Sequence, residues 1–235
     1  MYIFQNKFLK KKLIKIISTT NKIKIIKKNI EEINNEKGFI TFDKKKVFYD
    51  LIILSIGSRS KLYSTIEEGR TIEKDYKEVG LTAIIKHNIK IENASQFFLK
   101  EGPLAILPFQ KKAFSIVWSV TNKFFDVNKK NIKKILTEKL RVLLETKSIK
   151  NIETIQSFPI NLNLKTKYFK KNVLILGDGL HAVHPMAGQG FNLVLRDIKK
   201  LKELMSRTLT LGLLIKESFM LKDFYDSRKA ENNLF

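Results

Sequence analysis

Three parts of the chain carry apolar residues at helical spacing. Residues 5–18 form the first, with lysines between the apolar positions, which predicts a basic amphipathic helix. Its apolar positions are Phe8, Leu9, Leu13, Ile16 and Ile17. The same spacing predicts helices over 128–147 and 191–205. We expect the first helix to pack against a sheet, and its lysines leave binding to an anionic membrane surface open as the alternative.

Strands are predicted from two different patterns. Residues 51–56 and 172–176 are short, largely apolar runs that each lead into a glycine, which is typical of strands buried on both faces of a parallel sheet. Between residues 72 and 121, four short runs separated by turn residues predict an antiparallel sheet. Two short paired strands are expected around a turn at 34–38.

The order of these elements predicts a discontinuous α/β (α+β) fold. Helical and parallel elements occur near both ends of the chain, and the antiparallel strands lie between them. We therefore expect a partial Rossmann-like domain over 1–70 and 166–235, interrupted by a β-rich domain over 71–165. With 235 residues, 43% of them hydrophobic, the chain has enough apolar material for a core.

The formal net charge of +22 raises the question of nucleic acid or an anionic membrane as a partner. The lysines are scattered through every segment together with Ile and Asn, which indicates the residue bias of an AT-rich genome, and no nucleic-acid-binding motif accompanies them. We expect no nucleic-acid partner. The absence of cysteine excludes disulfides, thiolate nucleophiles and Cys-ligated metals.

The stretch GDGLHAVHPMAGQGFN, residues 177–192, concentrates glycines, a carboxylate and two histidines after the second apolar run. Because ligands of open α/β sheets bind beyond the carboxyl ends of the strands, Asp178 is expected at a ligand-binding edge. Its carboxylate accepts hydrogen bonds from hydroxyls and repels phosphate, which favours a sugar or ribityl chain. Gly188 and Gly190 precede a predicted helix whose first amides carry partial positive charge. This combination fits a reduced flavin, which has a polyol tail and a ring that becomes anionic.

His181 and His184 have the spacing of a possible metal site. Pro185 follows directly and disfavours a continuous metal-binding helix, so we expect no metal and a loop-shaping role for the histidines. A general acid or base role is the alternative. Neither the P-loop pattern nor G-x-G-x-x-G occurs in the chain.

Residues 177–197 closely resemble the motif G-D-A-A-H-x-x-H-P-x-A-G-Q-G-x-N-x-x-x-x-D of class A flavin-dependent monooxygenases with the para-hydroxybenzoate hydroxylase fold, and in particular the ubiquinone-biosynthesis ring hydroxylases. The matching positions are Gly177, Asp178, His181, His184, Pro185, Ala187, Gly188, Gln189, Gly190, Asn192 and Asp197. Five further segments resemble family segments in the same order: QNKFLKKKLIKI, DLIILSIGSRS, GPLAILPF, FSIVWSV and FYDSRKAENN.

This resemblance implies an oxidoreductase that uses FAD, NAD(P)H and O2 to hydroxylate the aromatic ring of a polyprenylated ubiquinone precursor. It implies no catalytic side chain; the positions it implies for FAD binding are Gly177, Asp178, His181, Pro185, Ala187, Gly188, Gln189, Gly190 and Asn192. The expected partners are a polyprenyl phenol or quinone precursor and other ubiquinone-biosynthesis proteins. We expect a cytoplasmic protein, with peripheral contact to the inner membrane as the alternative.

Several departures from the family pattern restrict this inference. Ile56 precedes Gly57 where the family carries Asp, Tyr63 stands where an arginine is expected, and Gly179-Leu180 replaces Ala-Ala. The glycine-rich βαβ unit that grips the ADP half of FAD has no counterpart in this sequence. The chain is therefore expected to hold half of a flavin site, which a separately encoded N-terminal piece would complete. A non-catalytic fragment or interaction subunit from a truncated gene is the alternative, so enzyme activity stays open.

Overall fold

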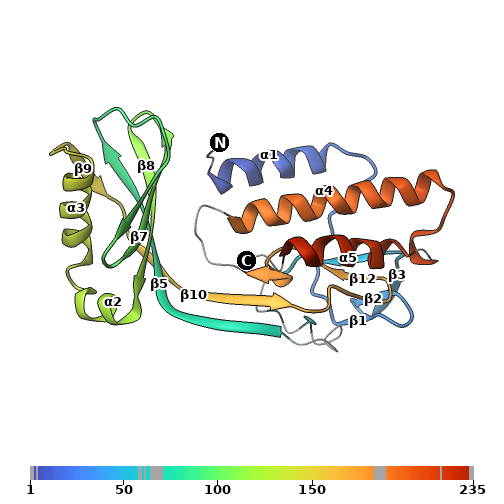
Figure 1. Ribbon diagram of the computed structural model, residues 1–235. Coiled ribbons are helices and arrows are strands. Elements are labelled where there is room, and N and C mark those ends of the chain that lie inside the picture. The colour runs from blue at the N-terminus through green and yellow to red at the C-terminus, as the bar shows by residue number, and fades with distance from the viewer. Residues whose placement is uncertain are drawn as a thin grey trace. The chain divides into compact units, whose positions relative to one another are not determined.

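The computed structural model describes residues 3, 5–57, 60, 62–63, 71–182, 189–217 and 219–232 (Figure 1). The chain divides into two compact units. Unit 1 consists of Met1–Ile26 and Tyr76–Ile160, and unit 2 of Lys27–Asp75 and Asn161–Phe235. The predicted limits at 70/71 and 165/166 differ from these by a few residues. Residues 1–26, which the sequence pattern assigned to the Rossmann-like part, group instead with the β-rich unit.

Unit 1 is built on an antiparallel sheet in the order β10-β5-β8-β7-β6, with β9 also paired to β5. The strands are β5 (Thr71–His87), β6 (Ser95–Leu99), β7 (Gly102–Gln110), β8 (Ala113–Thr121), β9 (Ile149–Ile152) and β10 (Gln156–Lys165). The first four confirm the antiparallel sheet predicted between residues 72 and 121. Residues alternate between its faces, so that Leu81, Ile85 and Trp118 are buried.

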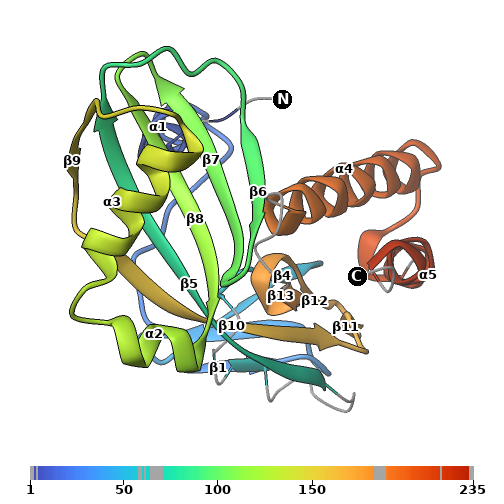
Figure 2. The ribbon, with the colours of Figure 1, turned by 60° about the vertical axis from the view of Figure 1, so that its left-hand side comes forward.

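Helices cover the face of this sheet whose apolar side chains form the core of unit 1 (Figure 2). The helix predicted over 128–147 is α3 (Ile132–Leu143), which is shorter than predicted at both ends. A separate helix, α2 (Asn122–Asn128), precedes it and was not predicted; the Thr121 side chain caps α2 by accepting a hydrogen bond from the Phe124 amide. The apolar stripe of α3, formed by Ile132, Leu136 and Leu140, joins the core of unit 1.

Helix α1 (Asn6–Ser18) confirms the first predicted helix, but its expected packing against a sheet is wrong. None of its residues is buried, and Phe8, Leu13 and Ile16 are about half exposed or more, at 57%, 48% and 61%. Helical spacing creates an apolar stripe, but it does not decide whether another element covers that stripe.

Unit 2 contains two three-stranded sheets, β1-β2-β3 and β11-β12-β4. The strands are β1 (Glu32–Asn34), β2 (Phe39–Phe42), β3 (Lys45–Phe48), β4 (Ile52–Leu54), β11 (Phe169–Lys170) and β12 (Val173–Ile175). Strands β1 and β2 are the pair predicted around 34–38. Strand β3 is added by a two-residue turn, in which Asp43 and Lys44 both have positive φ.

Strands β4 and β12 pair in parallel, as their continuous apolar pattern predicted. Helices α4 (Gln189–Thr210) and α5 (Met220–Asn232) pack with this sheet, and α4 contributes Leu201 and Leu204 to the core. The shorter elements of unit 2 are the 3₁₀ turns η2 (Gly177–Gly179) and η4 (Ile215–Glu217) and the strand β13 (His181–Ala182). Among the described residues, no helix is long and apolar enough to cross a membrane.

Candidate functional site

The two parallel strands of unit 2 end at the same edge, and a glycine with positive φ follows each one. Gly57 lies beyond β4 with φ 77°, and Gly177 beyond β12 with φ 81°. A Cβ built on either glycine would meet no atom of the described residues within 4 Å. Both glycines therefore turn the backbone sharply and face open space, which suits the close approach of a flat ligand.

Asp178 lies at this edge in the turn η2, and it is exposed. Hydrogen bonds fix the turn on both sides: the Leu180 amide donates to the Gly177 carbonyl at 2.8 Å, and the Lys165 amide donates to the Leu180 carbonyl at 2.9 Å. Strand β13 then pairs with β10, with His181 opposite Leu164. The carboxylate is thus presented to solvent from an ordered backbone, as a binding residue requires.

Behind the turn lies a buried polar network that joins β13 to both C-terminal helices. His181 Nε2 lies 2.5 Å from Asp197 Oδ2, and Arg228 Nε donates to Asp197 Oδ1 at 2.6 Å. Arg228 also donates to Glu231 and, at 3.1 Å, to Asn232, which donates in turn to the Tyr168 hydroxyl at 3.3 Å. These contacts tie the turn to α4 and α5.

The charges in this network compensate one another. Burial alone would lower the pKa of the Arg228 guanidinium, but its hydrogen bonds to Asp197 and Glu231 outweigh burial and raise that pKa. Burial raises the pKa of Tyr168; the hydrogen bond from Asn232 opposes this rise, and the negative charge of Asp197 adds to it. His181 Nε2 faces the other oxygen of the Asp197 carboxylate. His181 Nδ1 is buried and makes no hydrogen bond within the described part of the chain.

The network explains why motif positions far apart in the sequence occur together. Asp197 comes from the motif at 177–197, and Arg228 and Asn232 come from FYDSRKAENN. Sequence reasoning recognised both segments but did not predict that they contact each other. The sequence did contain a signal. Asp197 and Arg228 each stand at a position where the helical spacing predicts a buried apolar residue, and buried charged residues are almost always paired.

The structure brings only part of the predicted FAD-binding set to the edge. Gly177 and Asp178 lie there, whereas the His181 side chain is 1% exposed and faces Asp197. Gln189 and Gly190 begin helix α4, and Asn192 is exposed in its first turn, although the Gln189 side chain lies outside what the structure describes. Pro185, Ala187 and Gly188, together with His184, also lie outside the described residues.

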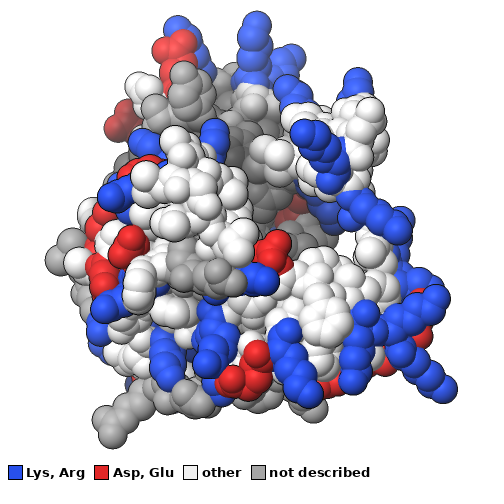
Figure 3. All heavy atoms as spheres, turned by 90° about the vertical axis from the view of Figure 1, so that its right-hand side faces the viewer, with Lys and Arg blue, Asp and Glu red and all other residues white. Residues whose placement is uncertain are grey.

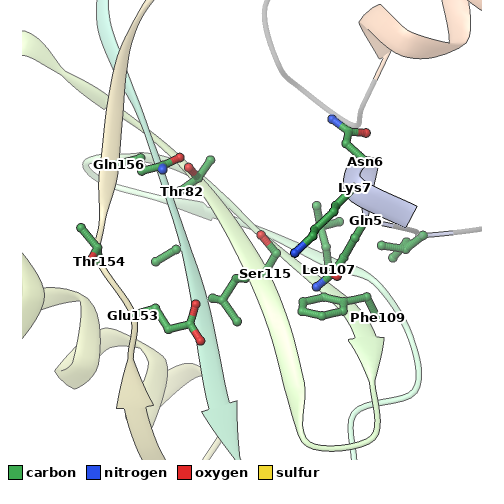
Figure 4. Close-up of a pocket in the computed structure, with 13 residues that line it drawn as sticks. Gln5, Asn6, Lys7, Thr82, Leu107, Phe109, Ser115, Glu153, Thr154 and Gln156 are labelled. Carbon is green, nitrogen blue, oxygen red and sulfur yellow. The ribbon is translucent and has the colours of Figure 1, made fainter. Parts of the chain in front are cut away.

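Unit 1 contains a pocket with a volume of about 990 Å³ (Figure 4). It lies on the sheet face opposite α3, where Thr82 and Ser115 alternate with the buried residues of β5 and β8. Leu107 and Phe109 add apolar surface from β7. Figure 4 shows Glu153 on one side and Lys7, from the first turn of α1, on another. The pocket therefore combines an apolar wall with a few polar and charged groups, as ligand pockets do.

The positive charge of the chain is not gathered into one stripe on the face shown in Figure 3. Lysine and arginine side chains are spread over that face and interspersed with acidic ones. This distribution agrees with a generally basic surface, as the scattered lysines of the sequence predicted.

Comparison with known proteins places these features in a family. A family model described as "FAD binding domain" matches residues 55–210. The chain is 25% identical to the mitochondrial ubiquinone biosynthesis monooxygenase COQ6 of Dictyostelium discoideum, over 77% of this chain and 46% of that protein. It is 26% identical to the ubiquinone hydroxylase UbiL of Rhodospirillum rubrum, over 78% of this chain and 43% of that protein. The chain thus spans less than half the length of these relatives.

Solved structures share the fold at low identity. The chain aligns with PqsL, a probable FAD-dependent monooxygenase from Pseudomonas aeruginosa, at a TM-score of 0.74 and 16% identity, over 96% of this chain and 66% of that one. It aligns with the flavin-dependent halogenase CmlS at 0.75 and 12% identity, over 97% of this chain and 44% of that one. The resemblance predicted from the motifs is confirmed: the chain has the fold of FAD-dependent monooxygenases, and it belongs to the FAD-binding domain family.

Proposed function

We propose that the chain is the middle and C-terminal part of an FAD-dependent monooxygenase that hydroxylates the aromatic ring of a polyprenylated ubiquinone precursor, using NAD(P)H and O2. The observation that carries the proposal is the edge of unit 2, where Gly57, Gly177 and the exposed carboxylate of Asp178 meet at the ends of paired parallel strands. The named activities of the two ubiquinone-biosynthesis relatives support the choice of substrate.

The residues at this edge fit a flavin. Asp178 would accept hydrogen bonds from ribityl hydroxyls, and the open space before Gly57 and Gly177 leaves room for the cofactor to lie against backbone. The first amides of α4, at Gln189 and Gly190, would present partial positive charge to an anionic ring. When bound, the flavin supplies the redox chemistry by accepting electrons from the nicotinamide and activating oxygen. The protein contributes binding, orientation and the exclusion of water.

The pocket in unit 1 suits the aromatic ring of the substrate. Leu107 and Phe109 offer apolar contact for the ring and the start of a prenyl chain, while Ser115, Thr82 and Glu153 offer hydrogen-bond partners for ring hydroxyls. Its volume of about 990 Å³ exceeds what a single ring needs, which agrees with a substrate that carries an apolar tail.

The parallel sheet of unit 2 indicates that a further polypeptide segment completes the site. In the described residues β4 is the outer strand, yet Ile53 on it is 42% exposed, whereas parallel sheets are normally covered. Ile52 bonds to β12 through its amide and Leu54 through its carbonyl, so the N–H and C=O of Ile53 point to the opposite edge. A βαβ segment that grips the ADP half of FAD would add a strand there. We propose that such a segment, either preceding this one in the same polypeptide or made separately, is needed for activity.

The test is FAD titration of the chain alone and of the chain mixed with the N-terminal βαβ segment of a full-length relative, followed by flavin absorbance. The chain alone should retain little FAD after gel filtration, and the mixture should bind it. In the mixture, Asp178→Ala should weaken binding about ten- to a hundredfold, because a hydrogen bond to a charged group contributes about 1.5–3 kcal/mol.

Asp126→Ala is the matched control, since Asp126 is an exposed carboxylate on α2 in the other unit. It should leave the affinity for FAD unchanged. Tight stoichiometric binding by the chain alone would show that no further segment is needed. An Asp178→Ala affinity equal to that of the parent would remove Asp178 from the flavin site, and a mixture that binds FAD without oxidising NAD(P)H would favour a non-catalytic subunit.

A further inference from the structure

Two of the departures from the family pattern, at positions 63 and 179, contact each other in the structure. A Cβ built on Gly179 would overlap the Tyr63 side chain, well inside van der Waals contact with Oη and Cζ and 3.0 Å from Cε2. The phenol of Tyr63 therefore occupies the space that any side chain at position 179 would need. Tyr63 is 2% exposed and Gly179 is buried, so neither has room to move away without disturbing the core.

Gly179 belongs to the turn that presents Asp178, so Tyr63 packs directly beneath the proposed ligand-binding carboxylate. The other supports of this turn come from β10 and α4, through the Lys165 amide and through the contact of His181 with Asp197. Lys165 also places its ammonium 5.8 Å from the centre of the Tyr63 ring. Tyr63 adds a support from the segment after β4, through its contact with Gly179.

The surroundings keep the phenol neutral. Burial raises the pKa of Tyr63, the backbone of Ile56 opposes that rise, and the negative charge of Asp178 adds to it. The hydroxyl is buried and makes no hydrogen bond of normal geometry to the described residues, although the Ile56 backbone lies near enough to influence its charge. The contact with Gly179 is one of shape, since the hydroxyl and the ring atoms Cζ and Cε2 fill the space where a Cβ at 179 would lie.

We infer that Tyr63 is a positioning residue for Asp178, and that Tyr63 and Gly179 form a matched pair in which the ring of one fills the space left by the other. This inference rests on the proposed function, because it concerns the turn that would hold the flavin. It gives a reason for both departures at once: a tyrosine at 63 requires glycine at 179, and glycine at 179 leaves a hole unless a large side chain fills it.

The experiment is a double-mutant cycle on the chain as printed, with Gly179→Ala, Tyr63→Leu and the double variant, and with Tyr63→Phe as the conservative change. Leucine lacks the three atoms that a Cβ at 179 would meet, whereas phenylalanine keeps the ring. Two readouts are measured: unfolding by urea, and amide hydrogen exchange of residues 177–182 compared with β12.

Gly179→Ala should lower the urea midpoint, and adding Tyr63→Leu should recover part of the loss rather than deepen it. Tyr63→Leu alone should speed exchange at 177–182 about tenfold or more while β12 changes less, and Tyr63→Phe should stay close to the parent. Parent-like stability of Gly179→Ala, losses that simply add in the double variant, or an equal rise of exchange in β12 and 177–182 would each overturn the pairing.

An FAD titration of the mixture with the N-terminal βαβ segment separates this inference from the proposed function. If exchange and stability behave as expected but Asp178→Ala leaves FAD binding unchanged, the pair positions a turn that does not hold flavin, and the proposed function fails alone. If Asp178→Ala weakens FAD binding but Tyr63→Leu changes neither exchange nor affinity, the positioning role fails and the proposed function stands.

Discussion

Arg228 on α5 donates to the carboxylate of Asp197 on α4 at 2.6 Å, and both side chains are buried. The same carboxylate contacts His181, three residues after Asp178. A helix near the end of the chain thus supports the turn at the proposed flavin edge. Two sequence motifs separated by some thirty positions therefore form one buried ion pair, between Asp197 and Arg228.

Replacing Arg228 by Met should therefore be costly. The change leaves the Asp197 carboxylate buried without its cationic partner. Removing one partner of a buried ion pair typically lowers the free energy of unfolding by about 3–5 kcal/mol. Urea unfolding followed by circular dichroism measures this loss. Arg196→Met, which removes an exposed arginine next to Asp197 in sequence, is the control and should change stability by less than about 0.5 kcal/mol. Equal effects of the two variants would mean that the Arg228 contact adds no stability.

The elements predicted well from sequence are those that are specified by residues next to one another in the chain. The runs at 51–56 and 172–176 are largely apolar and each leads into a glycine; they pair in parallel as β4 and β12, although Ile53 of β4 is exposed among the described residues rather than buried on both faces. The motif at 177–192 placed Asp178 at the end of a strand because strand, glycine and carboxylate follow each other directly in the chain.

What failed depends on contacts between distant residues. Helix α1 has the predicted stripe, yet burial is a property of its neighbours and not of its own spacing. Strands β9 and β10 are short or carry polar residues on both faces, so their pairing with β5 decides their conformation. The contacts of Tyr63 with Gly179 and of Arg228 with Asp197 join segments that are far apart in the chain, so the sequence does not tell which residue is the partner of which.

Gly177 and Gly212 offer a matched test of the open space at the edge. Both have positive φ, 81° and 71°, and a Cβ on either would have no neighbour within 4 Å in the part of the chain that the structure describes. Alanine at each should cost about 1 kcal/mol of stability from backbone strain alone. Only Gly177→Ala should also weaken FAD binding to the complemented protein, because Gly212 lies after α4 and away from the strand ends. Affinities by flavin fluorescence check this, and a loss shared by both variants would point to stability rather than to the ligand.

The free edge of β4 predicts the effect of a proline at position 53. Ile53→Pro removes an amide that points away from β12, so the isolated chain should unfold at nearly the parent urea concentration. The same change should reduce association with an N-terminal βαβ segment at least about tenfold. A strand added at this edge would lose one hydrogen bond to β4, and the proline ring would clash with it. Ile53→Val keeps the amide and serves as control. Association measured by calorimetry that is unaffected by proline would place the added strand elsewhere.

His87 gives unit 1 a pH dependence. It is 1% exposed against the Phe114 ring, and burial lowers its pKa below the ordinary value of 6.5. The unfolded chain therefore binds a proton more readily than the folded one just below that value, so stability is complete above pH 6.5 and falls as the pH drops through it. His87→Gln should flatten this dependence. Urea midpoints at several pH values between about 7.5 and 5.5 test it, and an unchanged slope in the variant would assign the effect to other groups.

We expect Ile56 to limit the enzyme activity of the complemented protein. It is 39% exposed beside Gly57, at the edge where the family pattern has an aspartate, and an apolar side chain there leaves polar partners of the ligand unpaired. We therefore expect complementation to restore FAD binding more fully than turnover, and Ile56→Asp to raise NAD(P)H oxidation and substrate hydroxylation about tenfold, since one hydrogen bond to a charged group is involved. Ile56→Leu preserves the apolar character and should change neither rate. Efficient hydroxylation by the unmodified protein with no gain from Ile56→Asp would show that the departure is harmless, whereas bound flavin that neither form reduces would indicate a subunit that has kept the fold and lost the reaction.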